Sequence, residues 1–208
     1  MIRSLRSLLP VAALLSACAC MPQPGHQVYG PREEGLTLAY EDPSLPQPQQ
    51  SQERLQVRVA KASFPSAGTG TVLLDYTSLR GSLTLALRHQ AGGIALLGPD
   101  GKDLAQLLPE GFPRVASWQA RGTSFQVIGR GAWDGAAMLP STSPSVGVWV
   151  EARPASGVTR RTLYLPDLGE VESLELRQGV WIPVNRLMAR GFTDLPAAKP
   201  SSPEPTHG

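Results

Sequence analysis

The chain has 208 residues, of which 41% are hydrophobic and 17% charged, and it contains 21 glycines and 20 prolines. Its net charge is +2, but two of the 19 basic residues, Arg3 and Arg6, stand at the N-terminus, which leaves 17 basic against 17 acidic residues in the remainder. This composition suits one domain of short elements, and the neutral remainder gives no basis for binding nucleic acid, which requires a basic surface.

Residues 1–17 have the layout of a secretory signal peptide. The basic segment 1–7 is followed by the apolar segment 8–17, which ends in small residues. Ten helical residues cover about 15 Å, half of the ~30 Å hydrocarbon core of a bilayer. We therefore predict a cleaved signal peptide and not a permanent transmembrane helix.

The residues Leu15, Ser16, Ala17 and Cys18 resemble the lipobox of bacterial lipoproteins, with Leu three positions before Cys and two small residues between them. In that family the Cys sulfur receives a diacylglycerol, a dedicated peptidase cuts before it, and the new N-terminus is usually acylated with a fatty acid such as palmitate. The resemblance implies that Cys18 is the lipidation site and the first mature residue. The lipid bilayer is then a partner, held by several acyl chains because one chain alone binds only marginally.

Three details around this box matter for its interpretation. The alternative is an ordinary signal peptide cleaved at Ala17 or Ala19, with no role for the cysteines. Cys20 lies in a poorer box without the leucine, so its modification stays open. In Gram-negative lipoproteins an Asp after the modified Cys usually retains the protein in the inner membrane; here Ala19 follows, which implies the outer membrane, with its face left open.

We predict that residues 18–54 form the lipidated N-terminus and a disordered tether. Residues 43–52 are nearly all Pro, Gln and Ser. Such a composition buries too little apolar surface to offset the entropy of ordering the chain. Within the tether, residues 35–40 alternate apolar and polar side chains, which predicts an edge strand or a segment that folds onto a partner.

Residues 55–193 are predicted to form one β domain. Alternation with a period of two indicates half-buried strands, further apolar runs indicate more strands, and Gly- and Asp-rich turns such as Asp100-Gly101 separate them. The alternating segments are 55–59, 82–87, 146–151 and 173–177, and the other runs are 71–76, 93–97, 114–120, 123–128, 161–165 and 180–184.

About ten short strands with frequent Gly and Pro predict an all-β fold, an antiparallel β-sandwich or a barrel-like domain. Short helical turns are expected at 103–108 and 185–190. Residues 194–208 are predicted to be a disordered tail.

The domain lacks the usual catalytic and metal-binding groupings. Its one histidine, His89, is expected at a strand end facing water, because no nucleophile motif accompanies it. The segment 100–103 lacks the spacing of acids in an EF-hand and is interpreted as a tight turn. Both cysteines lie before the domain, which excludes an internal disulfide. The sequence thus predicts no enzyme, no cofactor and no metal.

A possible contact loop opens at Arg130, Trp133 and Asp134 and runs to residue 145. Long irregular loops in compact domains are often functional. Trp133 has two interpretations, a cover over the end of the domain or a platform for stacking a sugar.

These observations favour a membrane-anchored lipoprotein that acts as a non-enzymatic binding or assembly module in the cell envelope, with an envelope protein as partner. The alternative is a carbohydrate-binding or carbohydrate-hydrolysing envelope domain that uses Trp133 and nearby acids. An exposed aromatic in a groove would favour the alternative, and a buried Trp133 would remove its support.

Overall fold

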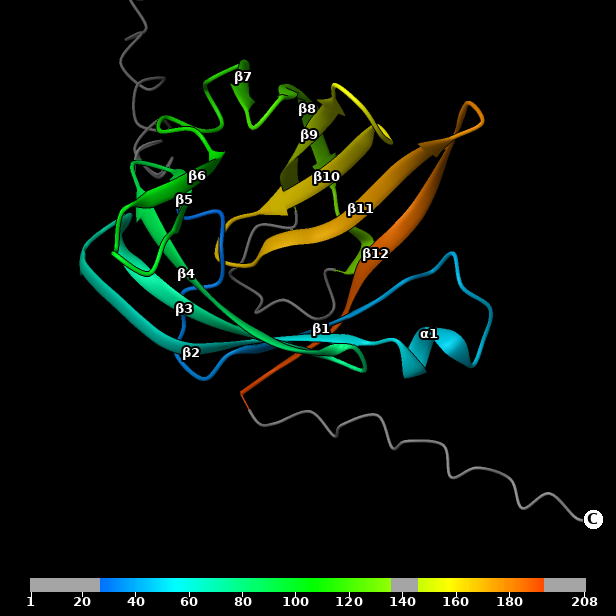
Figure 1. Ribbon diagram of the computed structural model, residues 1–208, viewed down its shortest axis with the longest axis horizontal. Coiled ribbons are helices and arrows are strands. Elements are labelled where there is room, and N and C mark those ends of the chain that lie inside the picture. Colours follow the sequence, from blue (N-terminus) through cyan, green and yellow to red (C-terminus); the bar gives the residue numbers. More distant parts are fainter. Residues whose placement is uncertain (1–26, 136–145, 193–208) are drawn as a thin grey trace, which may run out of the picture.

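The structure is a computed structural model that describes residues 27–135 and 146–192 (Figure 1). The signal peptide, Cys18, Cys20 and the C-terminal tail of the sequence analysis lie outside these residues. The described chain is almost entirely antiparallel β-structure, as the sequence predicts. None of its helices is long and apolar enough to cross a membrane.

Twelve strands and one short helix make up the described chain. In order these are β1 (Thr37–Glu41), α1 (Gln49–Gln52), β2 (Leu55–Ser66), β3 (Thr69–Ser78), β4 (Gly81–Gln90), β5 (Gly93–Leu97), β6 (Asp103–Leu108), β7 (Ser117–Ala120), β8 (Thr123–Ala132), β9 (Val146–Pro154), β10 (Arg160–Leu165), β11 (Gly169–Arg177) and β12 (Val180–Gly191). All ten strands predicted between 55 and 184 are present.

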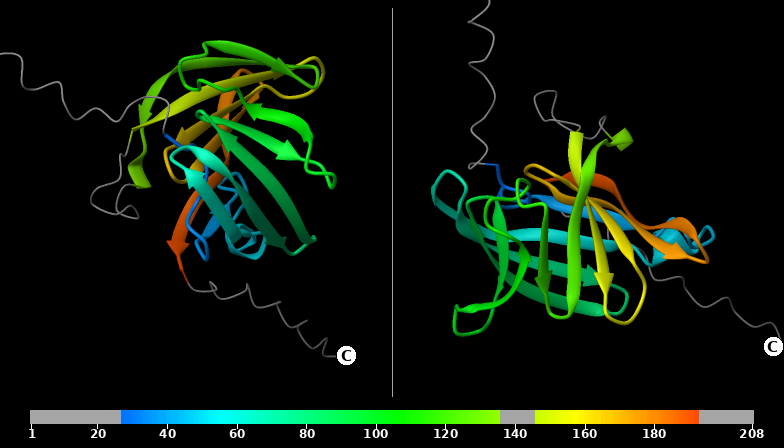
Figure 2. Two further views of the ribbon diagram at one scale, coloured as in Figure 1. Left: turned by 90° about the vertical axis from the view of Figure 1, so that its left-hand side faces the viewer. Right: turned by 90° about the horizontal axis from the view of Figure 1, so that it is seen from above.

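The strands form one sheet in the order β6-β5-β4-β3-β2-β1-β12-β11-β10-β9-β8-β7. It consists of two meanders, β1 to β6 and β7 to β12, that are joined where β1 pairs with β12. The sheet curls until its two end strands, β6 and β7, approach each other (Figures 1 and 2). The result is a nearly closed barrel rather than a sandwich.

Local turn chemistry explains several of the hairpins. The pairs Ala91-Gly92, Arg121-Gly122 and Gln178-Gly179 link consecutive strands, and both residues of each pair have positive φ, between 47° and 83°. This conformation matches type I′ turns, whose twist fits antiparallel strands. Glycine is favoured at the second position of such a turn because it adopts positive φ without steric cost.

The segment between β6 and β7 crosses the gap in the barrel and plugs its interior. Phe112 in this segment is fully buried, and its ring lies edge-on to Tyr29, Trp118 and Tyr164 with centroids 4.8–6.2 Å away. The Gly111 amide donates a hydrogen bond of 2.8 Å to the Ala91 carbonyl, which ties the segment to the β4–β5 turn.

The boundary of the folded part differs from the predicted tether of 18–54. Strand β1 lies within that range, and all five of its residues are buried between β2 and β12. It is therefore an inner strand of the sheet and not the edge strand that its alternation suggested. Val28, Tyr29 and Leu36 before it are buried as well. The ordered fold begins some 28 residues before the predicted start at residue 55.

Two predicted helical segments are strands. Residues 103–108 form β6 and pair with β5, and residues 185–190 belong to β12. In both segments the pairing to a neighbouring strand supplies the backbone hydrogen bonds that a short isolated helix lacks.

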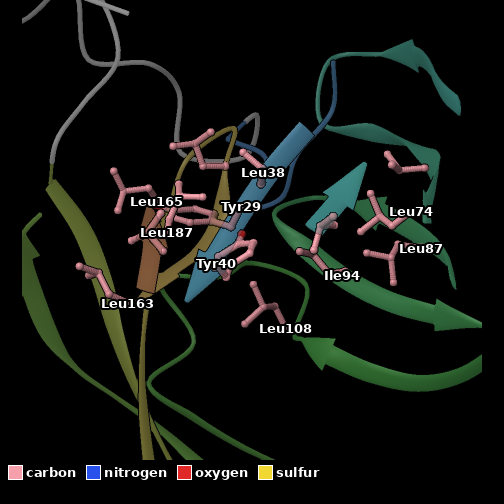
Figure 3. Packing of buried hydrophobic residues seen from close by; sticks show 14 of the residues in the cluster. Tyr29, Leu38, Tyr40, Leu74, Leu87, Ile94, Leu108, Leu163, Leu165 and Leu187 are labelled. Carbon is pink, nitrogen blue, oxygen red and sulfur yellow. The ribbon is translucent and has the colours of Figure 1, made fainter. Parts of the chain in front are cut away.

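The core lies inside the curled sheet and unites both meanders. Figure 3 shows Tyr29 and Tyr40 between two groups of aliphatic side chains that come from opposite sides of the barrel. One group contains Leu163, Leu165 and Leu187, and the other Leu74, Leu87 and Ile94.

Candidate functional site

A cavity of about 200 Å³ lies inside the barrel and opens at one side. Most of its wall is aliphatic or aromatic. The lining side chains come from both meanders and from the chain before β1, and they include Tyr29, Pro31, Tyr40, Leu55, Val57, Leu74, Tyr76, Leu87, Ile94, Leu107, Leu108, Tyr164, Leu168, Glu170 and Asn185. A mainly apolar cavity with a few convergent polar groups is the usual form of a small-molecule site.

The polar part of the wall is centred on Glu170, near the start of β11. Its Oε1 accepts hydrogen bonds from Ser173 Oγ at 2.8 Å and from Asn185 Nδ2 at 2.7 Å. Its backbone carbonyl accepts a hydrogen bond from the Tyr40 hydroxyl at 2.8 Å. Ser173 Oγ also lies 2.9 Å from Thr162 Oγ1. Side chains of β11 and β12 thus hold the carboxylate directly, β1 holds the backbone of the same residue, and β10 supports Ser173.

Three tyrosines, Tyr40, Tyr76 and Tyr164, line the cavity together with Glu170. Burial, followed by the charge of Glu170, raises the pKa of Tyr76 above its ordinary value. The same two causes raise the pKa of Tyr40 and of Tyr164 further, and Arg160 acts in the opposite direction on Tyr164. All three phenols therefore stay protonated at neutral pH and can donate hydrogen bonds.

The charge of the cavity wall is one-sided. Among the described residues that line the cavity, no Arg or Lys is present, and Glu170 is the single acidic side chain. The side chains that hydrogen-bond to its carboxylate, Ser173 and Asn185, are neutral. A carboxylate held by neutral donors attracts hydrogen-bond donors and cations and repels anions, while Arg160 and Arg130 act on the wall from outside the lining, through Tyr164 and Tyr29.

His89 lies in the interior of the barrel and not at a solvent-facing strand end, as the sequence suggested. Its side chain is 1% exposed, and neither ring nitrogen has a hydrogen-bond partner among the described residues. It packs against Phe64, with ring centroids 5.6 Å apart. Burial lowers its pKa from 6.5 to about 4, so the imidazole is neutral at physiological pH.

The three residues of the predicted contact loop do not converge. Arg130 lies exposed in β8, whereas Trp133 is 3% exposed and belongs to the core. Asp134 is exposed and accepts a hydrogen bond from Arg186 Nη2 at 3.0 Å, and Arg186 also contacts Glu172. The rest of this loop, residues 136–145, lies outside the described residues.

The burial of Trp133 removes the sequence argument for a carbohydrate site. Stacking on a sugar requires an accessible aromatic face, and Trp133 instead packs in the core with Gly135 against its ring. Within 27–135 and 146–192, no group of three or more His, Cys, Asp or Glu side chains has a geometry that could hold a metal ion.

The cavity residues were missed at the level of sequence because no local motif unites them. Tyr40, Tyr76, Tyr164 and Glu170 lie on four different strands and are separated by up to 130 residues. The one available signal was Tyr40 at the end of an alternating segment inside an otherwise Pro- and Gln-rich region.

Comparison with models of known protein families finds no match, and neither does comparison with curated proteins. Two solved structures are similar in fold. One is provisionally described as an exported protein with a YmcC-like fold from Bacteroides fragilis, with 13% identity, a TM-score of 0.45, and coverage of 79% of this chain and 99% of that chain. The other is provisionally described as a lipoprotein from Parabacteroides distasonis, with 12% identity, a TM-score of 0.44 and the same coverage.

Proposed function

We propose that the chain is a lipid-anchored, non-enzymatic binding module of the bacterial cell envelope, held in the outer membrane through acylated Cys18. The observation that carries this proposal is the box Leu15-Ser16-Ala17-Cys18 directly behind a ten-residue apolar segment. The outer membrane follows from Ala19, which stands where an Asp would retain a lipoprotein in the inner membrane.

The position of the fold relative to Cys18 supports a barrel close to the membrane surface. The described chain starts at Gln27, nine residues after Cys18. Nine extended residues reach at most about 32 Å. Tyr29, Gly30 and Pro31, which follow at once, line the cavity. The chain end that leads to the anchor is therefore the same end that forms part of the cavity wall.

The interior of the barrel supports binding rather than catalysis. Glu170 is fixed by hydrogen bonds to Ser173 and Asn185, and no histidine or cysteine lines the cavity among the described residues. Ser173, whose hydroxyl donates to this carboxylate, is fully buried and is not part of the cavity lining, so the pair offers no accessible nucleophile to a bound ligand. A partner protein in the envelope is part of the proposal, and the exposed surface of the barrel is available to it.

Labelling with a fatty acid tests the anchor. Cells that produce the wild-type chain, Cys18→Ser or Cys20→Ser are grown with a traceable palmitate analogue and then fractionated. Wild type and Cys20→Ser are expected in the outer-membrane fraction with label, because the thiol of Cys18 is intact in both. Cys18→Ser is expected without label, as an unprocessed precursor or a soluble protein. Unlabelled, soluble wild-type protein would overturn the proposal.

A further inference from the structure

The size and lining of the barrel cavity limit what it can hold. Its volume of about 200 Å³ is too small for a lipid with two chains. Apolar cavities of about 150 Å³ hold a single small ring, so this one has room for a ring or one short chain segment. Leu74, Leu87 and Ile94 on one side supply the apolar contact for such a chain.

The polar wall limits which head group the ligand can carry. Glu170 Oε1 accepts hydrogen bonds from Ser173 and Asn185, which leaves Oε2 as the acceptor that this carboxylate offers to a ligand. Because no Arg or Lys lines the described cavity wall, an entering carboxylate or phosphate finds no cationic partner in the wall and faces the like charge of Glu170. A hydroxyl or an ammonium group, in contrast, can donate a hydrogen bond to the carboxylate of Glu170.

We propose that this cavity binds a single-chain amphiphile whose head group is neutral or cationic, with the chain between the two meanders and the head at Glu170. This inference deepens the proposed function and rests on it only for the source of the ligand, the bilayer to which the barrel is anchored. Tyr29 in the cavity wall is only eleven residues after Cys18 in the sequence, which limits how far the cavity can lie from that source.

Access to the cavity lies near the gap in the barrel. Leu107 and Leu108 of the end strand β6 line the cavity, and β6 is not paired with β7. Leu107 is 42% exposed, so one side of it faces solvent while another faces the cavity. A larger side chain at this position is therefore expected to obstruct the cavity.

Binding of three matched probes tests the head-group selectivity. Octan-1-ol, octylamine and octanoate have the same chain and differ in charge. Their affinities are measured at pH 7.5 by calorimetry with the purified full chain that carries Cys18→Ser, which has no lipid anchor. We expect the alcohol and the amine to bind at least tenfold more tightly than octanoate, because the carboxylate of Glu170 repels the third probe alone.

Two pairs of variants locate the site. Glu170→Gln keeps the shape and hydrogen bonds of the residue while removing its charge, so octanoate is expected to bind as well as octan-1-ol. Glu172→Gln, on the same strand but outside the cavity lining, is the control that retains selectivity. Leu107→Trp is expected to weaken all three probes at least tenfold, whereas Leu104→Trp, exposed on the same strand and not part of the lining, leaves them unchanged.

The outcomes separate this inference from the proposed anchor. The proposed ligand class is overturned if none of the three probes binds, if wild type binds octanoate and octan-1-ol equally well, or if Glu170→Gln keeps the selectivity of wild type. None of these results depends on lipidation, since the chain used lacks the Cys18 thiol. Conversely, failure of palmitate labelling with intact probe selectivity removes the anchor and leaves the binding site.

Discussion

His89 is a buried ionisable side chain whose two ring nitrogens lack partners among the described residues. Its folded-state pKa of about 4 lies below the ordinary 6.5, so the unfolded chain takes up a proton at a higher pH than the folded chain. The free energy of unfolding therefore falls as the pH drops below 6.5, and the loss is complete below pH 4. At pH 5 the contribution is about 2 kcal/mol relative to neutral pH.

Replacing His89 by leucine is expected to remove this pH dependence. Urea unfolding of wild type and His89→Leu at pH 7 and pH 5 measures it, because the titration of the carboxylates is common to both proteins and cancels in the comparison. The difference in unfolding free energy between the two proteins should shift by about 2 kcal/mol in favour of the variant from pH 7 to pH 5. An equal pH dependence of both proteins would show that the histidine is hydrated or paired in solution.

The carboxylate of Glu170 illustrates why single residues of the site were hard to predict. Its neighbours in sequence, Gly169 and Val171, form an ordinary strand start, and nothing there distinguishes Glu170 from Glu172. The two differ through their long-range partners, since Glu170 meets Asn185 and Glu172 meets Arg186. The register of β11 against β10 shifts between these two glutamates, since Leu163 pairs with Glu172 and the next residue, Tyr164, pairs with Glu170.

At the scale of elements, β1 is the strand that most changes the expected organisation. The sequence predicted an edge strand or a partner-binding segment within a tether, whereas β1 is an inner strand that pairs with β2 and, across about 150 residues, with β12. Leu38 in this strand is 1% exposed. Its side chain packs in the shared core, where no local pattern could have placed it.

Leu38→Ala tests whether β1 is part of the folded core. Truncation of a buried leucine removes apolar contact and leaves a cavity, so the unfolding free energy should fall by about 2–5 kcal/mol. Leu79→Ala is the matched control, because Leu79 is 60% exposed in the β3–β4 turn. Chemical unfolding followed by tryptophan fluorescence measures both. Equal stability of the two variants would place β1 outside the cooperative unit.

Turns between strands could largely be predicted from their glycines, and the turn at Gly92 also packs against the segment that fills the barrel. Both Gly92 and Gly122 have positive φ, but a Cβ at Gly92 would lie 2.5 Å from the Phe112 carbonyl oxygen, whereas a Cβ at Gly122 meets nothing within 4 Å. Gly122→Ala should thus cost about 1–2 kcal/mol from backbone strain alone. Gly92→Ala should cost more, because the segment that plugs the barrel must also move. Thermal unfolding of both variants measures the difference, and equal costs would contradict this packing.

In β6 the helical spacing of the leucines conflicts with the pairing of the segment to a neighbouring strand. Leu104, Leu107 and Leu108 have the i, i+3, i+4 spacing of a short helix. In the fold the segment instead pairs with β5, through Ile94 with Leu108 and Leu96 with Ala105. A six-residue helix has no stability of its own, so the available strand edge decides the conformation.

For the whole molecule, composition and turn spacing were sufficient to predict the all-β class. The choice between a sandwich and a barrel depends instead on which strands meet at the ends of the sheet. That choice is made by β1 pairing with β12 and by the approach of β6 to β7. Both events join residues distant in sequence. The cavity is a consequence of the same closure, which explains why the fold class was predictable while the binding site was not.

We propose that the mature protein starts at a lipidated Cys18 a few residues before the barrel. Mass spectrometry of the N-terminal peptide, from protein extracted from envelope membranes with detergent, tests this start and its lipid in one experiment. We expect a peptide that begins at Cys18 and bears a diacylglyceryl group on sulfur and an acyl chain on its amine. A peptide that begins at Cys18 or Cys20 without lipid, or that retains residues 1–17, would contradict the account.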